Sequence, residues 1–329
     1  MLNSLPFVSI VIPTKNSAKL LESCLNGISK QSYENKEIII SDGMSTDDTV
    51  DIARKYKARI IKNPQIMAEP GIYFGMKAAK GDLIMVIAVD NIFENKEALK
   101  IMVSVFRDKK IYAAFPKHDS LERDSLFTKY INTFTDPFNH FVYGYAANNR
   151  TFGKVYKTIE HNSVYDIYDF SSKKILPILA LAQGFMVRKN FIENRGNIYD
   201  DIVPIANLIK KKKMMAYVHS ASLIHHTVKN INHFWRKQRW AAKNFFNKKN
   251  YGFSSRINTL TNWQKIKAYI YPFYSISIVF PFLFSFYASL RDREKMWLFH
   301  PFISFISGLA MWWEFVRIKV GLDKEISRL

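Results

Sequence analysis

Cysteine is almost absent from this sequence of 329 residues, in which Cys24 is the single example. One thiol cannot form an internal disulfide, so a disulfide-stabilised secreted scaffold is excluded. Residues 1–7 also lack the basic segment and the small-residue cleavage site of a signal peptide, and none is predicted. The pattern around Cys24 indicates one face of a helix, and a small core side chain is its simplest interpretation.

Acidic residues are absent from residues 202–291, although the whole chain contains 28 Asp and Glu. Lys and Arg recur through the same stretch, including the run at 210–213, and the formal net charge of the chain is +20. We therefore expect a strongly positive face on the C-terminal half. Nucleic acid, anionic lipid headgroups or nucleotide phosphates would fit such a face, and a merely solvated basic surface is the alternative.

The first third of the chain alternates short apolar strands with helices. Strands are predicted at 7–12, 37–42, 58–62 and 83–89, and helices at about 17–28, 50–57 and 72–79. This spacing is typical of βαβ units and predicts an α/β fold with a mainly parallel sheet. The run at 83–89 is apolar without alternation, so it is predicted to lie mid-sheet, covered on both faces.

Two of these predicted strands lead into a carboxylate, Asp42 and Asp90. Ligands of open α/β sheets bind at the carboxyl edge of the strands. An ionised carboxylate at that edge is costly unless it is paired or binds a metal, and a divalent cation carrying nucleotide phosphates would supply the charge. Capping of the next helix is the alternative for Asp90.

The order of these pieces resembles the nucleotide-sugar-binding half of the family-2 glycosyltransferases, which have the GT-A fold. The matching segments are 8–16, 37–49 and 79–90, with a further block near 182–240. The resemblance implies a Rossmann-like GT-A sheet flanked by helices. It organises the chain as a nucleotide-sugar-binding half (1–110), an acceptor and catalytic half (111–232), a basic amphipathic connector (233–267) and a helical hairpin with a tail (268–329).

The resemblance also assigns a donor site. It places the nucleobase against a loop made of Pro13, Thr14, Lys15 and Asn16. Asp42 would accept a hydrogen bond from the uracil or the ribose. Asp90 would be the second acid of the Asp-x-Asp metal motif, holding Mg²⁺ or Mn²⁺ against the diphosphate, with His226 as a further candidate ligand. Ala88 stands where the family has the first acid of that motif.

A second group of site residues comes from the later block. Gly184 matches the glycine-containing strand below the donor sugar, and Asp201 matches the catalytic base of an inverting displacement. Arg236 and Arg239 would bind the diphosphate, and Trp240 would form the floor of the acceptor site. Two alternatives remain open: an N-cap at residues 200–201, and an amphipathic helix lying on a membrane surface at 233–240.

The C-terminal part contains two stretches without charged residues, 268–290 and 296–313. At about 1.5 Å per residue they would be roughly 34 and 27 Å long, enough to span or nearly span a bilayer. They predict a membrane hairpin. Prolines at 272, 281 and 301 allow kinked or re-entrant helices, and an interfacial hairpin or a soluble buried helix pair are the alternatives.

Together these features predict a membrane-anchored inverting glycosyltransferase acting at the cytoplasmic face. Its expected partners are a nucleotide sugar, most simply a UDP-sugar, a lipid-linked or membrane-proximal glycan acceptor, membrane lipids, and Mg²⁺ or Mn²⁺. A catalytically degenerate GT-A scaffold or a binding protein at the membrane is the alternative, suggested by Ala88. Nucleic acid is disfavoured, because the positive charge adjoins apolar segments.

Overall fold

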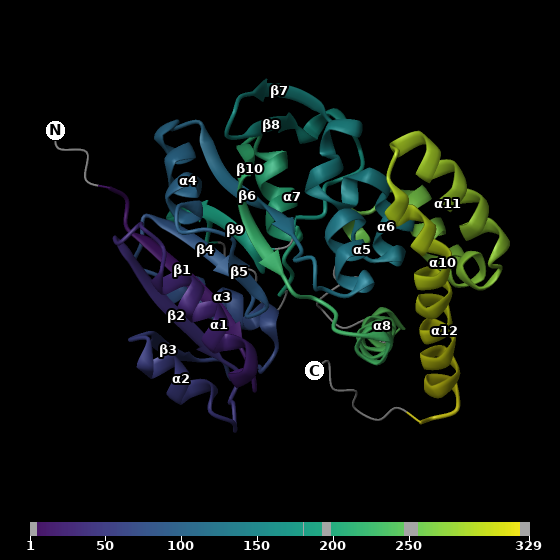
Figure 1. The fold of residues 1–329 in the computed structure, drawn as a ribbon, viewed down its shortest axis with the longest axis horizontal. Helices are drawn as coiled ribbons and strands as arrows, with labels where there is room; N and C mark the ends of the chain where they lie inside the picture. Colours follow the sequence, from purple (N-terminus) through teal and green to yellow (C-terminus); the bar gives the residue numbers. More distant parts are fainter. Residues whose placement is uncertain (1–4, 180, 193–198, 247–255, 323–329) are drawn as a thin grey trace. The chain divides into compact units, whose positions relative to one another are not determined.

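The structure is a computed structural model that describes residues 5–179, 181–192, 199–246 and 256–322 (Figure 1). The chain divides into two compact units. Unit 1 comprises Met1–Asp119, Tyr156–Ser172 and Leu179–His225, and unit 2 comprises Ser120–Val155, Lys173–Ile178 and His226–Leu329. Both predicted halves, 1–110 and 111–232, contribute strands to the single sheet of unit 1.

The sheet of unit 1 has the strand order β3-β2-β1-β4-β9-β6-β10-β8-β7, and β5 also pairs with β10 (Figure 1). The strands are β1 (Val8–Thr14), β2 (Lys36–Asp42), β3 (Arg59–Lys62), β4 (Leu83–Ile87), β5 (Asn91–Phe93), β6 (Ile111–Asp119), β7 (Lys157–His161), β8 (Asp166–Asp169), β9 (Gln183–Arg188) and β10 (Met214–His225). The four strands predicted before residue 90 are confirmed, although β4 ends two residues early.

Most strands of the sheet run in one direction. β1, β2, β3 and β4 are parallel to one another, and β6 is parallel to β10. β9 lies between β4 and β6 and is antiparallel to both, so these two groups share a direction. The carboxyl ends of six strands therefore meet at one edge of the sheet, together with the amino end of β9. The predicted mainly parallel sheet is confirmed, with three exceptions: the central β9, and β5 and β8, which are both antiparallel to β10.

One face of the sheet packs against α1 (Ala18–Ser29), α2 (Thr49–Lys55) and α4 (Ala98–Ser104). Their buried side chains, such as Leu25, form one hydrophobic core with the inward residues of β1, β2 and β4. Cys24 belongs to this core, and burial raises the pKa of its thiol to about 12. The interpretation of Cys24 as a core side chain is confirmed.

The opposite face carries α3 (Ala68–Ala78), which packs against β1 and β2. A Cβ atom on Gly75 would lie 2.3 Å from Cγ1 of Val11, a residue of β1 whose neighbours in the strand point to the other face. Only glycine permits this approach of helix to strand. Covered on both sides, β4 is buried at every residue, as its unbroken apolar run predicts.

Unit 2 is helical. Its α-helices are α5 (Leu126–Phe134), α6 (Pro137–Tyr143), α8 (Ile231–Phe246), α10 (Asn262–Ile276), α11 (Val279–Asp292) and α12 (His300–Lys319). Its core surrounds Trp297, which is fully buried and stacks on Phe134 with 3.7 Å between the ring centroids. A second contact joins α8 to α12, where the hydroxyl of Ser307 donates to Gln238 at 2.7 Å.

The predicted membrane hairpin is replaced by a bent helix pair. The stretch 268–290 is broken between α10 and α11, whose axes are bent by 99° (Figure 1). Ile278 has φ +58° at the break, and Pro281 follows in the first turn of α11, where its missing N–H costs nothing. Within the described part of the chain, no single helix is long and apolar enough to cross a membrane, but α10 and α11 pass that test together.

The second predicted segment, 296–313, is divided between a 3₁₀ turn (Lys295–Phe299) and the start of α12. The face of α12 that packs into unit 2 includes small and polar residues, among them Ser304, Gly308 and Glu314. Such a face is typical of a helix that packs closely on its neighbours.

The core of unit 2 also contains two buried histidines, His140 on α6 and His300 on α12. The imidazole of His140 lies 4.8 Å from the ring of Trp297, and Nδ1 of His300 lies 2.5 Å from the hydroxyl of Tyr130. Burial lowers the pKa of each imidazole to about 3. Both are therefore neutral in the folded protein.

These histidines predict that unit 2 loses stability as the pH falls from 7 to 5. A histidine titrates near pH 6.5 once unfolded, so below that value the unfolded chain binds more protons than the folded one. The expected loss is about 2 kcal/mol for one such histidine over this range. Intrinsic fluorescence in denaturant follows unit 2 alone, because all 6 tryptophans of the chain lie within residues 226–329.

The variant His140→Gln is the test of cause, because it removes one titrating group from the core. Its stability should fall less steeply with pH than that of the wild type, whatever its stability at pH 7. His233→Gln, on the partly exposed start of α8, is the matched control and should keep the wild-type slope. An unchanged slope in His140→Gln would contradict the assignment.

Candidate active site

The first part of the site lies where β1 and β2 end side by side. The register pairs Thr14 with Asp42, so the loop after β1 meets the turn after β2. The buried Asp42 carboxylate accepts hydrogen bonds from the backbone N–H of Ser45 at 3.0 Å and from its hydroxyl at 2.6 Å. Asp42 is thereby fixed at the carboxyl edge of the sheet.

Asn16 joins the two loops. It has φ +46°, a left-handed conformation that asparagine tolerates. Its backbone N–H donates to the hydroxyl of Ser45 at 2.8 Å, and its side-chain oxygen accepts from the backbone N–H of Thr46 at 2.8 Å. The loop 13–16 and Asp42, both predicted to bind the donor nucleotide, are thus brought together. Their role in binding stays a prediction.

The second part of the site surrounds Asp90, three residues beyond the end of β4. Its Oδ2 lies 3.7 Å from Nε2 of His225, the last residue of β10. The ring of His225 lies 5.6 Å from that of His118 on β6, and Nε2 of His118 lies 2.7 Å from the carbonyl oxygen of Gln183. The ends of β4, β6 and β10 therefore supply neighbouring side chains, and the start of β9 supplies a backbone carbonyl.

Asn91 adds an unsatisfied acceptor beside this group. It is 1% exposed, and its side-chain N–H donates to the carbonyl of Ala182 at 3.1 Å. Its Oδ1 is buried without a hydrogen-bond partner among the described residues. Such an oxygen costs about 1–3 kcal/mol when nothing binds it, which is characteristic of a position that a ligand or ion completes.

Gly184 lies at the same edge, in the second residue of β9. Its φ is +83°, and a Cβ atom there would lie 2.3 Å from Cδ1 of Leu223 and 3.0 Å from Cγ of Pro116. Glycine is therefore required both by the backbone conformation and by the packing against β10 and β6. Gly184 follows Gln183, whose carbonyl oxygen contacts His118, and its predicted place below the donor sugar stays a prediction.

The two adjacent histidines of the sequence have separate partners. The prediction named His226 as the metal candidate, whereas the structure places His225 beside Asp90. Nδ1 of His226 lies 2.8 Å from Oδ1 of Asp124 in unit 2. Because consecutive residues of an extended chain point to opposite sides, only the strand register decides which histidine faces the acid.

The pair Asp200–Asp201 precedes α7 (Val203–Lys210). The buried carboxylate of Asp200 accepts from the backbone N–H groups of Ile202 at 2.7 Å and Val203 at 3.1 Å, so it holds the turn that leads into α7, whose N-cap position is Ile202. Asp201 is less buried. Its role as the catalytic base stays a prediction.

The remaining predicted residues lie on α8 in unit 2. Nε of Arg239 pairs with Oε1 of Glu314, a carboxylate on α12 that is 2% exposed. Leaving such a buried acid unpaired would be costly, so Arg239 has a structural task within unit 2. Arg236 is exposed and Trp240 is partly buried. Their predicted binding of diphosphate and acceptor stays a prediction.

The sequence from β1 to the end of β8 matches the profile of Glycosyl transferase family 2 over residues 9–171. These residues form a family 2 glycosyltransferase domain. The profile therefore covers the nucleotide-side strands together with Asp90, Asn91 and His118, whereas β9, α7 and β10, which carries His225, follow it in the chain.

Curated relatives of this glycosyltransferase domain match in part. The O-antigen chain rhamnosyltransferase WbaN of Salmonella anatum is 32% identical over 124 residues, which is 35% of this chain and 39% of the relative. The poly(ribitol-phosphate) β-N-acetylglucosaminyltransferase TarS of Staphylococcus aureus is 31% identical over 100 residues, or 28% of this chain and 17% of the relative. The matches thus span well under half of either relative.

A solved structure gives the same fold. The mannosyltransferase PcManGT from Pyrobaculum calidifontis, in complex with GDP-Man and Mn²⁺, has a TM-score of 0.53 at 14% identity, covering 95% of this chain and 88% of that chain. The fold of the family 2 glycosyltransferase domain is thus an α/β fold of the GT-A type, with a mixed, mostly parallel sheet.

Proposed function

We propose that this protein transfers a sugar from a nucleotide-sugar donor to an acceptor hydroxyl with inversion at the anomeric carbon. The observation that carries the proposal is the single sheet edge of unit 1 that holds Asp42 and Asp90, both within the family 2 glycosyltransferase match, together with His225 of β10. The names of the relatives support a glycan of the cell envelope, free or lipid-linked, as the acceptor.

In this proposal the donor nucleotide lies at the ends of β1 and β2. The carboxylate of Asp42 is held by Ser45 and accepts a further hydrogen bond from the base or the ribose. The loop 13–16 is anchored by Asn16 and lines the base. A site whose groups are fixed before the ligand arrives loses less entropy on binding.

The Asp90 group fits a divalent cation. The carboxylate of Asp90 and Nε2 of His225 lie 3.7 Å apart, and the orphaned Oδ1 of Asn91 adds an oxygen nearby in sequence. Oxygen donors suit Mg²⁺ and Mn²⁺, and an imidazole favours Mn²⁺ of the two. When bound, the cation neutralises the charge that develops on the departing diphosphate. The Mn²⁺ of the mannosyltransferase complex supports this choice.

In this proposal a residue of the chain accepts the proton that the acceptor hydroxyl loses. Asp201 takes the proton of the acceptor hydroxyl as its oxygen forms a bond to the anomeric carbon. The bond from that carbon to the diphosphate oxygen breaks on the opposite side, and the nucleoside diphosphate leaves with the electron pair. Asp200 holds the turn that leads into α7 and so fixes the position of its neighbour.

Asp201→Asn tests the base. Loss of a general base lowers a rate by about 10² to 10⁴, so hydrolysis across a panel of nucleotide sugars with Mn²⁺ should fall by at least a hundredfold. Binding of the nucleoside diphosphate, measured by calorimetry, should stay within about twofold, because Asp201 does not touch the nucleotide in this account.

Asp200→Asn is the matched control, because an amide oxygen can still accept the two N–H bonds that hold the turn before α7. It should keep most of the activity. A fully active Asp201→Asn enzyme would contradict the base assignment. Tight metal-dependent nucleotide binding without turnover of any donor or acceptor would instead favour the degenerate scaffold that Ala88 suggests.

The second element of the proposal is a membrane surface for unit 2. α11 has an inverted pattern: its buried residues are Pro281, Ser285 and Ala288, whereas its large apolar side chains other than the partly buried Phe284 are exposed. The exposed set on α10 and α11 includes Tyr269, Ile270, Phe273, Ile276, Ile278, Val279, Phe280, Phe282, Leu283, Phe286, Tyr287 and Leu290. An apolar face of this size is not stable against water and indicates a membrane or protein contact.

Charge and shape favour a lipid surface. The bend of the pair around Ile278 and Phe280 has no charged residue. Lys265 and Lys267 lie near one end, and three basic residues alternate with two acids at 291–295, at or beyond the other end. Legs of 15 and 14 residues bent by 99° form a V. At about 1.5 Å per residue it is roughly 15 Å deep, about half of a bilayer core.

A re-entrant V keeps both charged ends on one side of the membrane, where anionic headgroups attract them. We propose that this side is cytoplasmic, because clusters of Lys and Arg are retained there. The arrangement removes the difficulty of a spanning hairpin, in which the basic residues 291–295 would lie on the far side.

Flotation with vesicles of mixed neutral and anionic lipid tests the membrane surface. The triple variant Phe280→Ser, Leu283→Ser, Phe286→Ser should lower partitioning by at least about a hundredfold, because burial of each large apolar side chain contributes about 1.5–3 kcal/mol. Leu126→Ser, an equally exposed residue of α5, is the control and should float as the wild type does. Equal flotation of the triple variant would contradict the proposal, provided its tryptophan fluorescence shows a folded unit 2.

A further inference from the structure

A second group of ligand-type side chains lies at the other margin of the sheet in unit 1. The β7–β8 hairpin pairs His161 with Asp166 across its two strands. β10 carries an irregularity between Val218 and Ser222 in its pairing with β6, and His219 lies inside it. Bulges of this kind redirect side chains and recur beside functional sites.

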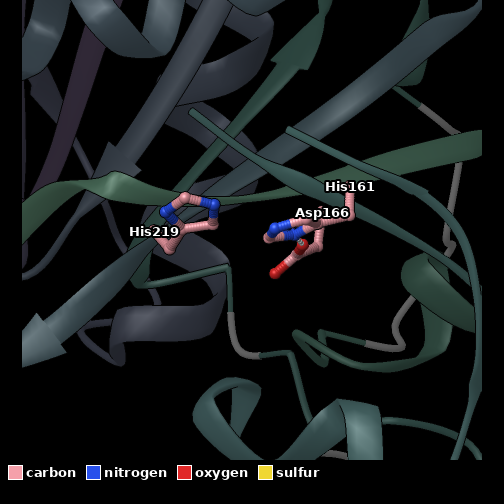
Figure 2. Close-up of side chains that lie close together, drawn as sticks. All are labelled: His161, Asp166 and His219. Atoms are coloured by element: carbon pink, nitrogen blue, oxygen red, sulfur yellow. Dashed lines mark hydrogen bonds and ion pairs between the residues drawn. The ribbon is translucent and has the colours of Figure 1, made fainter. Parts of the chain in front are cut away.

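His161, Asp166 and His219 converge at this margin (Figure 2). One donor atom from each residue lies within 4.8 Å of the other two. Nδ1 of His161 lies 2.5 Å from Oδ1 of Asp166, and the rings of the two histidines are stacked with centroids 6.1 Å apart. None of these three residues belongs to the Asp90 group.

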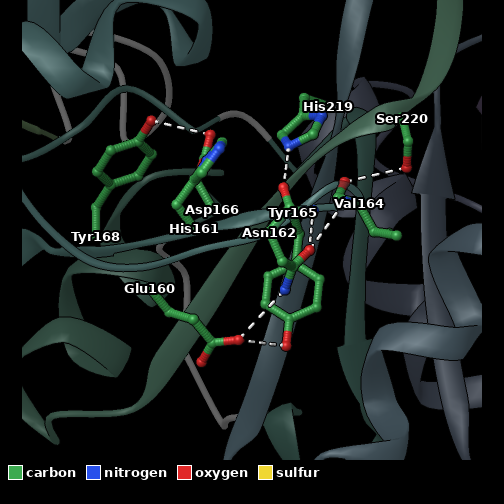
Figure 3. Close-up of polar contacts among 9 residues, drawn as sticks. All are labelled: Glu160, His161, Asn162, Val164, Tyr165, Asp166, Tyr168, His219 and Ser220. Atoms are coloured by element: carbon green, nitrogen blue, oxygen red, sulfur yellow. Dashed lines mark hydrogen bonds and ion pairs between the residues drawn. The ribbon is translucent and has the colours of Figure 1, made fainter.

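The surroundings orient two of the three residues (Figure 3). Nε2 of His219 lies 3.1 Å from the carbonyl oxygen of Asn162. An N–H on Nε2 donates to this oxygen and leaves Nδ1 as the nitrogen that can bind a metal. The hydroxyl of Tyr168 donates to Oδ2 of Asp166 at 3.3 Å. Metal-binding histidines and carboxylates are typically held by such second contacts.

The turn of the hairpin is itself fixed to β10 (Figure 3). Asn162 accepts the backbone N–H groups of Val164 and Tyr165 at 2.8 and 2.9 Å. The hydroxyl of Ser220 donates to the carbonyl of Val164 at 3.0 Å. His219 and the hairpin are therefore held near each other before any ligand binds.

We propose that His161, Asp166 and His219 bind one divalent transition-metal ion of the zinc class. Two imidazoles and one carboxylate suit Zn²⁺, Co²⁺ or Ni²⁺ and are a poor set for Mg²⁺ or Ca²⁺. With metal–ligand bonds of about 2.1 Å, neighbouring ligand atoms of a tetrahedral ion are separated by about 3.4 Å. The three atoms already lie within 4.8 Å of one another, and binding would require side-chain rotation to reach that spacing, for which His161, with 73% of its side chain exposed, has the most room.

The ion would hold the strands at this margin of the sheet together. β8 pairs with β10 through only Ala216–Ile167 and Tyr217–Asp166, and β7 is the unprotected edge strand. A metal bound to β7, β8 and β10 at once joins all three strands. The inference concerns unit 1 alone and does not depend on the proposed sugar transfer.

Cobalt titration of the untagged full-length protein tests the site, because four-coordinate Co²⁺ absorbs strongly in the visible region. We expect one Co²⁺ per chain with that spectrum, displaced by Zn²⁺ and not by excess Mg²⁺. His161→Ala, Asp166→Asn and His219→Ala should each weaken Co²⁺ binding by at least about tenfold. His233→Ala removes a histidine of unit 2 outside the cluster and should leave binding unchanged.

Hydrogen exchange provides a second readout that does not depend on the spectrum. Zn²⁺ should slow exchange of the backbone amides of 157–169 in the wild type and have no effect in His161→Ala, which is exposed enough to be replaced without loss of the fold. The proposal is overturned if the wild type binds no Co²⁺ at millimolar concentration. It is equally overturned if all three cluster variants bind Co²⁺ as the wild type does.

Discussion

The direction of the strands in unit 1 is the constraint on which the site depends. Because β1, β2, β4, β6 and β10 all run the same way, their carboxyl ends meet at one edge, and each strand delivers a polar side chain there. Asp42, Asp90, His118 and His225 come from widely separated parts of the chain, yet the sheet leaves them on one rim. The antiparallel β9 does not break this arrangement, since it contributes its amino end and Gly184.

Some polar groups at the same rim are unfavourable for the stability of the protein without a ligand. Below the rim, β1 and β4 are buried at every residue and need no ligand. At the rim, Asn91 retains a buried oxygen without a partner among the described residues, and Asp90 has only an imidazole at 3.7 Å. In unit 2 the exposed phenylalanines of α11 are unfavourable in water in the same way. A buried acceptor at a sheet rim and a contiguous exposed apolar face are both typical of surfaces that a ligand or a lipid completes.

Much of the fold up to residue 90 could be predicted, because each strand there is a short apolar run bounded by a proline, a glycine or an acid. The start of α7 and the placement of Gly184 were also visible, since helix caps and strand glycines have local signals. The sequence did not predict whether His225 or His226 lies beside Asp90. That depends on the register of a twelve-residue strand with an internal irregularity, which no local pattern encodes.

Two further features lay beyond the sequence for physical reasons. Composition showed an apolar stretch at 268–290 but not the break at Ile278, which depends on one left-handed backbone conformation. The cluster of His161, Asp166 and His219 was missed because its residues are distant in sequence and lie in or beyond a segment without periodicity. Strand pairing alone brings them together.

The most direct test of the account is a crystal structure of the full chain with a nucleoside diphosphate and Mn²⁺, with anomalous scattering used to locate the metal. The account predicts one Mn²⁺ within ligand distance of Asp90, bridged by the diphosphate to a nucleoside that contacts Asp42. A nucleotide bound away from the ends of β1 and β2, or Mn²⁺ bound elsewhere with Asp90 uninvolved, would contradict it.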